Sequence, residues 1–207
     1  MTVTISCLYN NYTDAEVAIK NLEAAGVKHG DISVLASNAD EWYKGNSGKP
    51  GTFPDRNLNN KDDRAEGART GAGLGAVAGG AAGVLAGLGL MAIPGVGPIV
   101  AAGWLVSTLA GAAAGGAAGG VIGALTQAGV GKDEANIYAE GLRRGGAVVS
   151  ARVADVDASS LRAVMDHAAI QVTDRAAAYR KAGWKTFDPK ASPYTADQVR
   201  KERSLFM

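Results

Sequence analysis

The chain has 207 residues and a formal net charge of +1, from 21 Lys and Arg against 20 Asp and Glu. Because positive and negative side chains are almost equal in number, the composition indicates no strongly basic surface, and we expect no nucleic-acid partner. Cys7 is the only cysteine, which excludes an internal disulfide and fits a reducing compartment. The charges are unevenly spread, because none lies between Thr70 and Gly131, where most of the glycines also fall. An ordinary charged sequence is thus interrupted by one long apolar insertion.

Residues 1–37 are predicted to form the first half of a soluble domain. Residues 2–9 and 31–37 are short, apolar and rich in β-branched side chains, as expected of strands. The segment between them has helical periodicity, and Gly26 is a typical residue at the C-terminal end of such a helix. We therefore predict a β-α-β unit. Residues 38–66 are rich in Asn, Asp, Gly and Pro, which predicts a flexible loop.

The insertion, residues 67–131, is predicted to form a hairpin of two helices. Each arm, residues 71–93 and residues 99–126, is long enough to cross a bilayer, which takes about 20 helical residues. Prolines and glycines would break a helix between the arms. The residues expected to form the hairpin turn are Pro94, Gly95, Gly97 and Pro98.

Small residues recur at every fourth position along both arms. A glycine costs about 1 kcal/mol relative to Ala inside a helix, so the repeat needs a compensating gain. Small-xxx-small spacing supplies one, because it lets two helix backbones approach closely. A four-residue step also drifts by about 40° around the helix, so the stripe faces several neighbours and we expect a homo-oligomer. The predicted helix-packing residues are Gly67, Gly71, Gly75, Gly79, Gly83, Gly87, Gly103, Ser107, Gly111, Gly115, Gly119 and Gly123.

Two settings for this hairpin stay open. Its length and lack of charge favour the cytoplasmic membrane, with lipid as a partner. Arg64, Arg69 and Lys132 flank it, which would leave both termini cytoplasmic. Gly and Ala dominate the arms, however, and such weakly apolar helices are also suited to pack against copies of themselves. The alternative is therefore a soluble cytoplasmic assembly.

Residues 132–174 are predicted to complete the soluble domain. A helix is expected over 132–145, a strand over 146–155, a helix over 158–168 and a short strand over 169–173. This is a second β-α-β unit after a leading helix. Two such units predict an α+β fold, a ferredoxin-like sandwich with helices on one face of a four-stranded antiparallel sheet, interrupted by the Gly/Ala-rich helical hairpin.

The last segment, residues 175–207, is predicted to be a basic aromatic tail. Its aromatic residues are spaced along the segment: Tyr179, Trp184, Phe187, Tyr194 and Phe206. We expect these rings to dock an extended tail onto a neighbouring surface, since large apolar rings favour contact over a free end.

No group of residues predicts catalysis, a cofactor or a metal site. Matches to G-x-G-x-x-A at 73–78 and 87–92 lack the preceding strand that a dinucleotide site needs. His29 and His167 lie on separate elements, and a zinc site needs at least three protein ligands. Cys7 alternates with apolar neighbours, which predicts a core position.

Three motifs resemble one bacterial family. They are AIPGVGPIVAAG (92–103), EGLRRGGAVVSARV (140–153) and AGWKTFDPKASPYT (182–195), and the order of the elements around them agrees over nearly the whole chain. The pattern is similar to that of the general stress or heat-induced stress proteins. This resemblance implies an α+β fold and a link to stress, and it supplies no catalytic residues.

We therefore expect a non-enzymatic, stress-associated protein that self-assembles through its glycine-zipper hairpin at the cytoplasmic membrane. One alternative is a soluble high-order homo-oligomer, a scaffold or shell with buried hairpins. Another is a regulatory module that binds a small ligand on its sheet, with the hairpin as an anchor. The sequence does not identify such a ligand.

Overall fold

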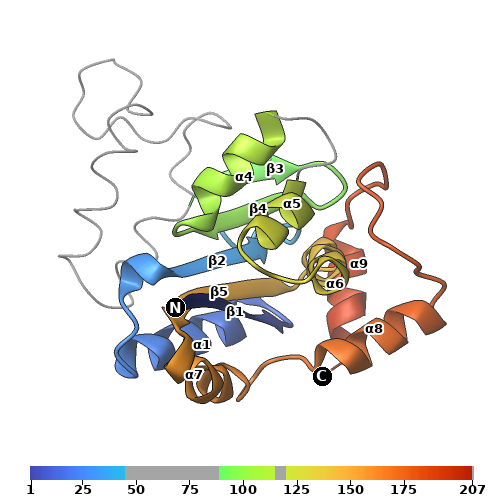
Figure 1. Ribbon diagram of the computed structural model, residues 1–207. Coiled ribbons are helices and arrows are strands. Elements are labelled where there is room, and N and C mark those ends of the chain that lie inside the picture. The colour runs from blue at the N-terminus through green and yellow to red at the C-terminus, as the bar shows by residue number, and fades with distance from the viewer. Residues whose placement is uncertain (45–88, 115–119, 207) are drawn as a thin grey trace.

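The structure is a computed structural model that describes residues 1–44, 89–114 and 120–206 (Figure 1). Its strands are β1 (Thr2–Tyr9), β2 (Ile32–Ser37), β3 (Gly89–Ile93), β4 (Gly97–Ala102) and β5 (Ala147–Ala154). Its helices are α1 (Tyr12–Ala24), α4 (Leu105–Ala114), α5 (Gly120–Gln127), α6 (Lys132–Arg143), α7 (Ala158–Met165), α8 (Val172–Lys181) and α9 (Ala196–Ser204).

One antiparallel sheet joins the strands in the order β1-β5-β2-β4-β3. β5 lies between β1 and β2, although the insertion separates it from both in the sequence. Val149 of β5 is aligned with Cys7 of β1 on one side and with Val34 of β2 on the other. Because both neighbours run antiparallel to β5, β1 and β2 run parallel to each other. The mixed helix and strand content agrees with the predicted α+β class.

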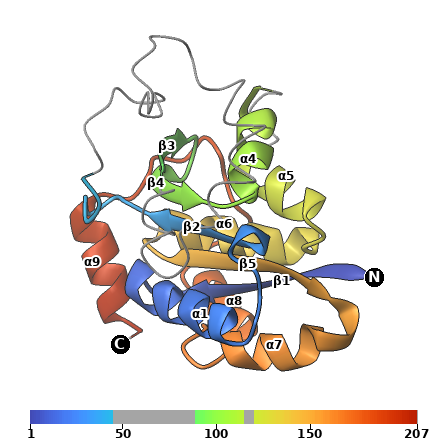
Figure 2. The same cartoon turned by 90° about the vertical axis from the view of Figure 1, so that its left-hand side faces the viewer.

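Helices cover both faces of this sheet. Side chains alternate along the strands, so Cys7 and Val149 pack with α1 and α7 on one face. Leu8 and Val148 point to the other face and pack with α4, α5 and α6. Figure 2 shows α1 and α7 on the lower side of the sheet and α4 and α5 on the upper side. The predicted sandwich had helices on one face only, whereas α4 and α5 of the insertion and α6, which follows it, form a second helical layer.

Local sequence signals account for the helices that flank the sheet. Asn11 caps α1, because its side-chain oxygen accepts a hydrogen bond from the Asp14 backbone N–H at 2.9 Å. In α6, acidic residues occupy the first turn and Arg143 the last, as the helix dipole favours. The buried positions Ala135 and Leu142 of α6 lie two turns apart and face the sheet.

Residues 89–102 form a β-hairpin, where the sequence predicted the facing ends of two helices. β3 pairs with β4, with Met91 opposite Ile99, and β4 also pairs with β2, with Leu35 opposite Ala101. The helical prediction was wrong here because the open edge of β2 offers partners to the backbone of a Val- and Ile-containing segment.

The chain does reverse at the predicted point, but between two strands. Pro94 and Gly95 lie in the turn, while Gly97 and Pro98 are the first two residues of β4. Gly95 has a φ of 75°, and a Cβ there would lie 2.6 Å from the Cα of Pro189. A glycine is therefore needed at this turn for both its conformation and its close contact.

The glycine pattern of the second predicted arm does not follow one helix. Gly103 precedes α4, has a φ of 89° and would bring a Cβ within 2.3 Å of the Ile32 carbonyl oxygen, so it serves a close backbone approach. Ser107 is exposed in α4, and Gly111 lies in the same helix. Gly123 lies in α5, and among the described residues no atom of a neighbouring segment lies within 4 Å of a Cβ built there. The other predicted packing residues lie outside the described residues: Gly67, Gly71, Gly75, Gly79, Gly83, Gly87, Gly115 and Gly119.

The helices of this second arm are shorter than predicted. One helix was expected over residues 99–126, but β4 takes the first of these residues, and α4 and α5 contain 10 and 8 residues. Across the ranges that the structure describes, no helix combines the length and the apolar character needed to cross a membrane. Residues 45–66 of the loop predicted over 38–66 and most of the first arm lie outside those ranges.

The strand predicted over residues 169–173 is reduced to a single bridge. The backbone N–H of Ile170 donates to the carbonyl oxygen of Leu8 at 2.7 Å. α8 then begins at Val172, so the chain leaves the sheet before a second residue pair can align with β1. The prediction was wrong because helix formation takes over this segment.

The C-terminal segment packs against the domain as two helices and a loop. It was predicted as an extended tail, but it contains most of α8 and all of α9. Tyr179 is 1% exposed and Phe187 is 9% exposed. Tyr179 and Phe187 are therefore docked, and the surface that receives them belongs to this same chain.

Candidate ligand site

A cavity of about 340 Å³ lies at the outer edge of β1. Residues of α6, of α7 and of the start of α8 line it, together with Cys7 of β1. α6 and α7 lie on opposite faces of the sheet, and only the Ile170 bridge stands where a fourth strand was predicted. The space between the two helices is therefore left unfilled. Its volume is near the lower end of the range of about 300–1,000 Å³ that is usual for small-molecule sites.

One wall of the cavity is apolar. It consists of Ile137 from α6, Ile170 from the bridge and Val172 from the start of α8. Ile137 is 7% exposed, and Ile170 and Val172 are half-buried. These branched side chains supply a surface that can bury a small aliphatic group.

The thiol of Cys7 forms part of the polar lining. Its sulfur lies 3.6 Å from Oδ1 of Asp166, which directly follows α7. Burial raises the pKa of the Cys7 thiol to about 12, with Arg162 opposing the rise and Asp166 adding to it. At neutral pH the thiol is therefore protonated, which makes it a weak hydrogen-bond donor and not a nucleophile.

The Glu134 carboxylate of α6 also lines the cavity, and Tyr138 of the same helix contacts it. The Tyr138 hydroxyl donates to the Ser6 carbonyl oxygen at 2.8 Å and also contacts the carboxylate of Glu134. Burial raises the pKa of Tyr138, and its hydrogen bond to Glu134 raises it further. Nη2 of Arg162 lies 3.8 Å from Oε1 of Glu134, so a cation from α7 faces an anion from α6 across the cavity.

The N-terminal end of α8 borders the same space. Gln171, Val172 and Thr173 all line the cavity, and no side chain caps the first turn of this helix. The first backbone N–H groups of a helix have no partner within it. This end of α8 therefore carries donors and partial positive charge at the cavity wall.

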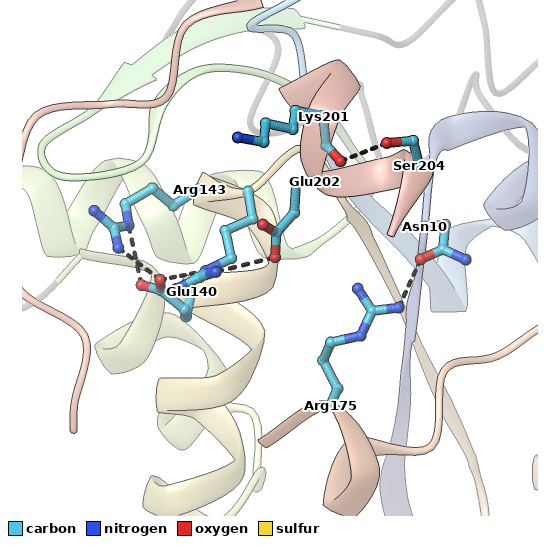
Figure 3. Close-up of polar contacts among 8 residues, drawn as sticks. Asn10, Glu140, Arg143, Arg175, Lys201, Glu202 and Ser204 are labelled. Carbon is cyan, nitrogen blue, oxygen red and sulfur yellow. Dashed lines mark hydrogen bonds and ion pairs between the residues drawn. The ribbon is translucent and has the colours of Figure 1, made fainter. Parts of the chain in front are cut away.

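A second polar cluster lies nearby, between α6 and the C-terminal helices (Figure 3). Glu140 of α6 is fully buried and contacts Arg143 and Arg144, each at 2.6 Å from Oε1. Arg144 also contacts Glu202 of α9 at 3.0 Å, and its guanidinium lies 4.2 Å from the ring centre of Tyr179. These contacts join α6 to both α8 and α9.

Two further arginines tie the C-terminal helices to the end of β1. Arg175 of α8 donates to the side-chain oxygen of Asn10 at 2.8 Å, and Arg203 of α9 donates to the Asn10 carbonyl oxygen at 3.2 Å. Arg203 also donates to the carbonyl oxygen of Gly145, before β5, at 2.7 Å. The cavity within this cluster measures only about 10 Å³, which is room for one water molecule at most. The cluster is therefore a structural clamp and not a ligand site.

Among the described residues that the sequence singled out as helix-packing or turn positions, from Pro94 to Ser107 and at Gly111 and Gly123, none lines the larger cavity. Cys7 was predicted in the core, and it is buried, but its position on the cavity wall was missed. His29 is 2.7 Å from Glu23, and His167 is exposed. Across residues 1–44, 89–114 and 120–206, no three His, Cys, Asp or Glu side chains come together as a metal site requires.

Comparisons with models of protein families, with curated proteins and with solved structures find no match to this chain. The geometry of the cavity and the sequence pattern are therefore the basis for a functional assignment.

Proposed function

We propose that this protein is a non-enzymatic binding module whose small-molecule ligand occupies the cavity at the β1 edge. The observation that carries the proposal is the cavity itself, which has the volume of a small-ligand site and brings opposite charges from α6 and α7 to one space. In this proposal Cys7 lines the site as a neutral, protonated thiol, because burial raises its pKa.

The proposed ancestry of this module is a ferredoxin-like core. Three features support it: β5 lies between the parallel strands β1 and β2, α1 and α7 share one face, and Ile170 bridges to the outer side of β1. In this view the bridge is a reduced fourth strand, and the β3-β4 hairpin extends the sheet at the opposite edge. The reduced strand is what leaves room for a ligand.

A binding test requires a variant that fills the cavity and a matched control. Thr173 and Thr13 are both exposed and are both the second residue of a helix, α8 and α1 respectively. We expect metabolites that raise the melting temperature of the native protein to lose this effect in Thr173→Trp and to keep it in Thr13→Trp. Stabilisation that is equal in both variants, or no stabilising metabolite at all, would contradict the proposal.

Self-association is a second proposed function, favoured by the unbroken glycine spacing from Gly67 to Gly87. Gly79 is on this repeat and its neighbour Gly80 is not. We expect Gly79→Leu to reduce the oligomer size in light scattering and Gly80→Leu to leave it unchanged, and equal assembly of both would refute the zipper. Cell fractionation then separates the proposed membrane location from the soluble assembly, and the link to stress rests on the family resemblance.

A further inference from the structure

We propose that the ligand of the β1-edge cavity is a zwitterion, a free α-amino acid with an aliphatic side chain. This inference rests on the proposed function, since it names the class of ligand for that same cavity. It follows from the placement of three kinds of surface around one space: carboxylates, a cationic wall and branched aliphatic side chains.

The carboxylates provide the site for an ammonium group. Glu134 comes from the first turn of α6 and Asp166 from the end of α7, so they approach the cavity from opposite faces of the sheet. Among the described residues, the hydrogen-bond donors to these carboxylates are neutral, the Cys7 thiol beside Asp166 and the Tyr138 hydroxyl beside Glu134, while the Arg162 guanidinium lies 3.8 Å from Glu134. Each carboxylate has oxygen lone pairs left for the three N–H donors of an ammonium group.

The cationic wall provides the site for a carboxylate. The uncapped N-terminus of α8, at Val172 and Thr173, presents backbone N–H groups and partial positive charge. Arg162 contributes a full positive charge, and its 3.8 Å separation from Glu134 is too long for a strong hydrogen bond. The guanidinium therefore keeps donors free for a ligand carboxylate.

The remaining wall selects an aliphatic side chain. Ile137, Ile170 and Val172 are branched and lie together on the cavity surface. Burying a leucine-sized side chain against such a surface favours binding, because it removes apolar area from water. A cavity of about 340 Å³ accommodates a ligand of this size and is small for a nucleotide or a lipid.

The test compares L-leucine with two analogues that each lack one of its charges. Isoamylamine lacks the carboxylate and 4-methylpentanoate lacks the ammonium group, while both keep the branched side chain. By titration calorimetry with the full chain, we expect L-leucine to bind at least about tenfold more tightly than either analogue, because one charged contact is worth at least about 1.4 kcal/mol. Equal affinities of leucine and either analogue would overturn the proposal.

Two variants test which residue binds the carboxylate of the ligand and which binds its ammonium group. Arg162→Gln should weaken L-leucine binding about tenfold and leave isoamylamine binding unchanged, whereas Asp166→Asn should weaken L-leucine and leave 4-methylpentanoate unchanged. Arg180→Gln, an exposed arginine later in α8, is the control and should bind L-leucine normally. The assignment would be contradicted if Arg162→Gln weakened isoamylamine binding as much as L-leucine binding, or if Asp166→Asn weakened 4-methylpentanoate binding as much as L-leucine binding.

The two proposals fail in different ways. If L-leucine does not bind but another metabolite stabilises the protein and loses this effect in Thr173→Trp, the zwitterion inference is wrong and the ligand site stands. If the cavity-filling variant has no effect on any ligand, the binding function itself is wrong.

Discussion

Replacing Cys7 with alanine isolates the contribution of one buried thiol to the pH dependence of folding. In the folded chain Cys7 is 3% exposed, and burial raises its pKa to about 12 from the ordinary value of 9.0. The unfolded chain therefore loses this proton first as the pH rises, which favours the unfolded state. The stability that the neutral thiol contributes is complete below pH 9 and is lost as the pH rises towards 12.

The size of the effect follows from the two pKa values. At pH 10 the unfolded thiol is mostly ionised, while the folded thiol remains protonated. One pH unit corresponds to about 1.4 kcal/mol, so this group lowers the free energy of unfolding by about 1.4 kcal/mol between pH 7 and pH 10. Burial also raises the pKa values of Tyr12 and Tyr179 to about 12. The stability that these tyrosines cease to contribute at high pH is the same in the native protein and in Cys7→Ala, so it cancels when the two proteins are compared.

Urea unfolding under reducing conditions, followed by tryptophan fluorescence at pH 7 and pH 10, measures this difference. Cys7→Ala starts from a lower stability because it leaves a small void. Between pH 7 and pH 10, its free energy of unfolding should fall by about 1.4 kcal/mol less than that of the native protein. Cys7→Val, which fills the void, should give the same difference. An equal fall with pH in all three proteins would refute the burial of the thiol.

Two further predictions concern stability at neutral pH. Glu140→Gln neutralises a fully buried carboxylate between two arginines and should cost about 3–5 kcal/mol in urea unfolding. Glu16→Gln, in a surface pair, should cost less than about 1 kcal/mol, and equal losses would contradict the clamp. Gly146→Ala brings a Cβ within 2.8 Å of the Tyr9 carbonyl oxygen and should cost about 1–3 kcal/mol. Gly123→Ala, in a helix with open space, should stabilise by up to about 1 kcal/mol; the reverse order in thermal unfolding would refute this packing.

Several elements outside the insertion were predictable because their signals are local. Residues 2–9 alternate and residues 132–145 have charges placed for a helix, and both segments fold as these patterns indicate. Residues 89–102 carry a pattern of Gly, Ala, Val and Ile that suits a buried helix as well as a buried strand. The choice between them depends on the free edge of β2, which is distant in the sequence and gives no local signal.

The cavity was beyond prediction from the sequence for a related reason. Its polar residues come from positions as far apart as Cys7, Glu134 and Arg162, each ordinary in its own segment. They meet because Val172 begins a helix where a strand was predicted, so that the edge of β1 stays open. Gln171, the residue before α8, is a weak N-cap residue. A stronger N-cap residue at this position would have predicted that a helix begins here, where we expected a strand.

The place of β5 in the sheet sets an order of events during synthesis. β1 pairs only with β5 among the named strands of the described residues, and the glycine-rich insertion lies between them in the chain. On the ribosome, therefore, the whole apolar insertion emerges before the first strand can find its partner. Long-range pairing of this kind is slow, and apolar segments exposed in the meantime are prone to aggregate. We therefore expect the nascent insertion to be most prone to aggregation before residues 147–154 have emerged and paired with β1.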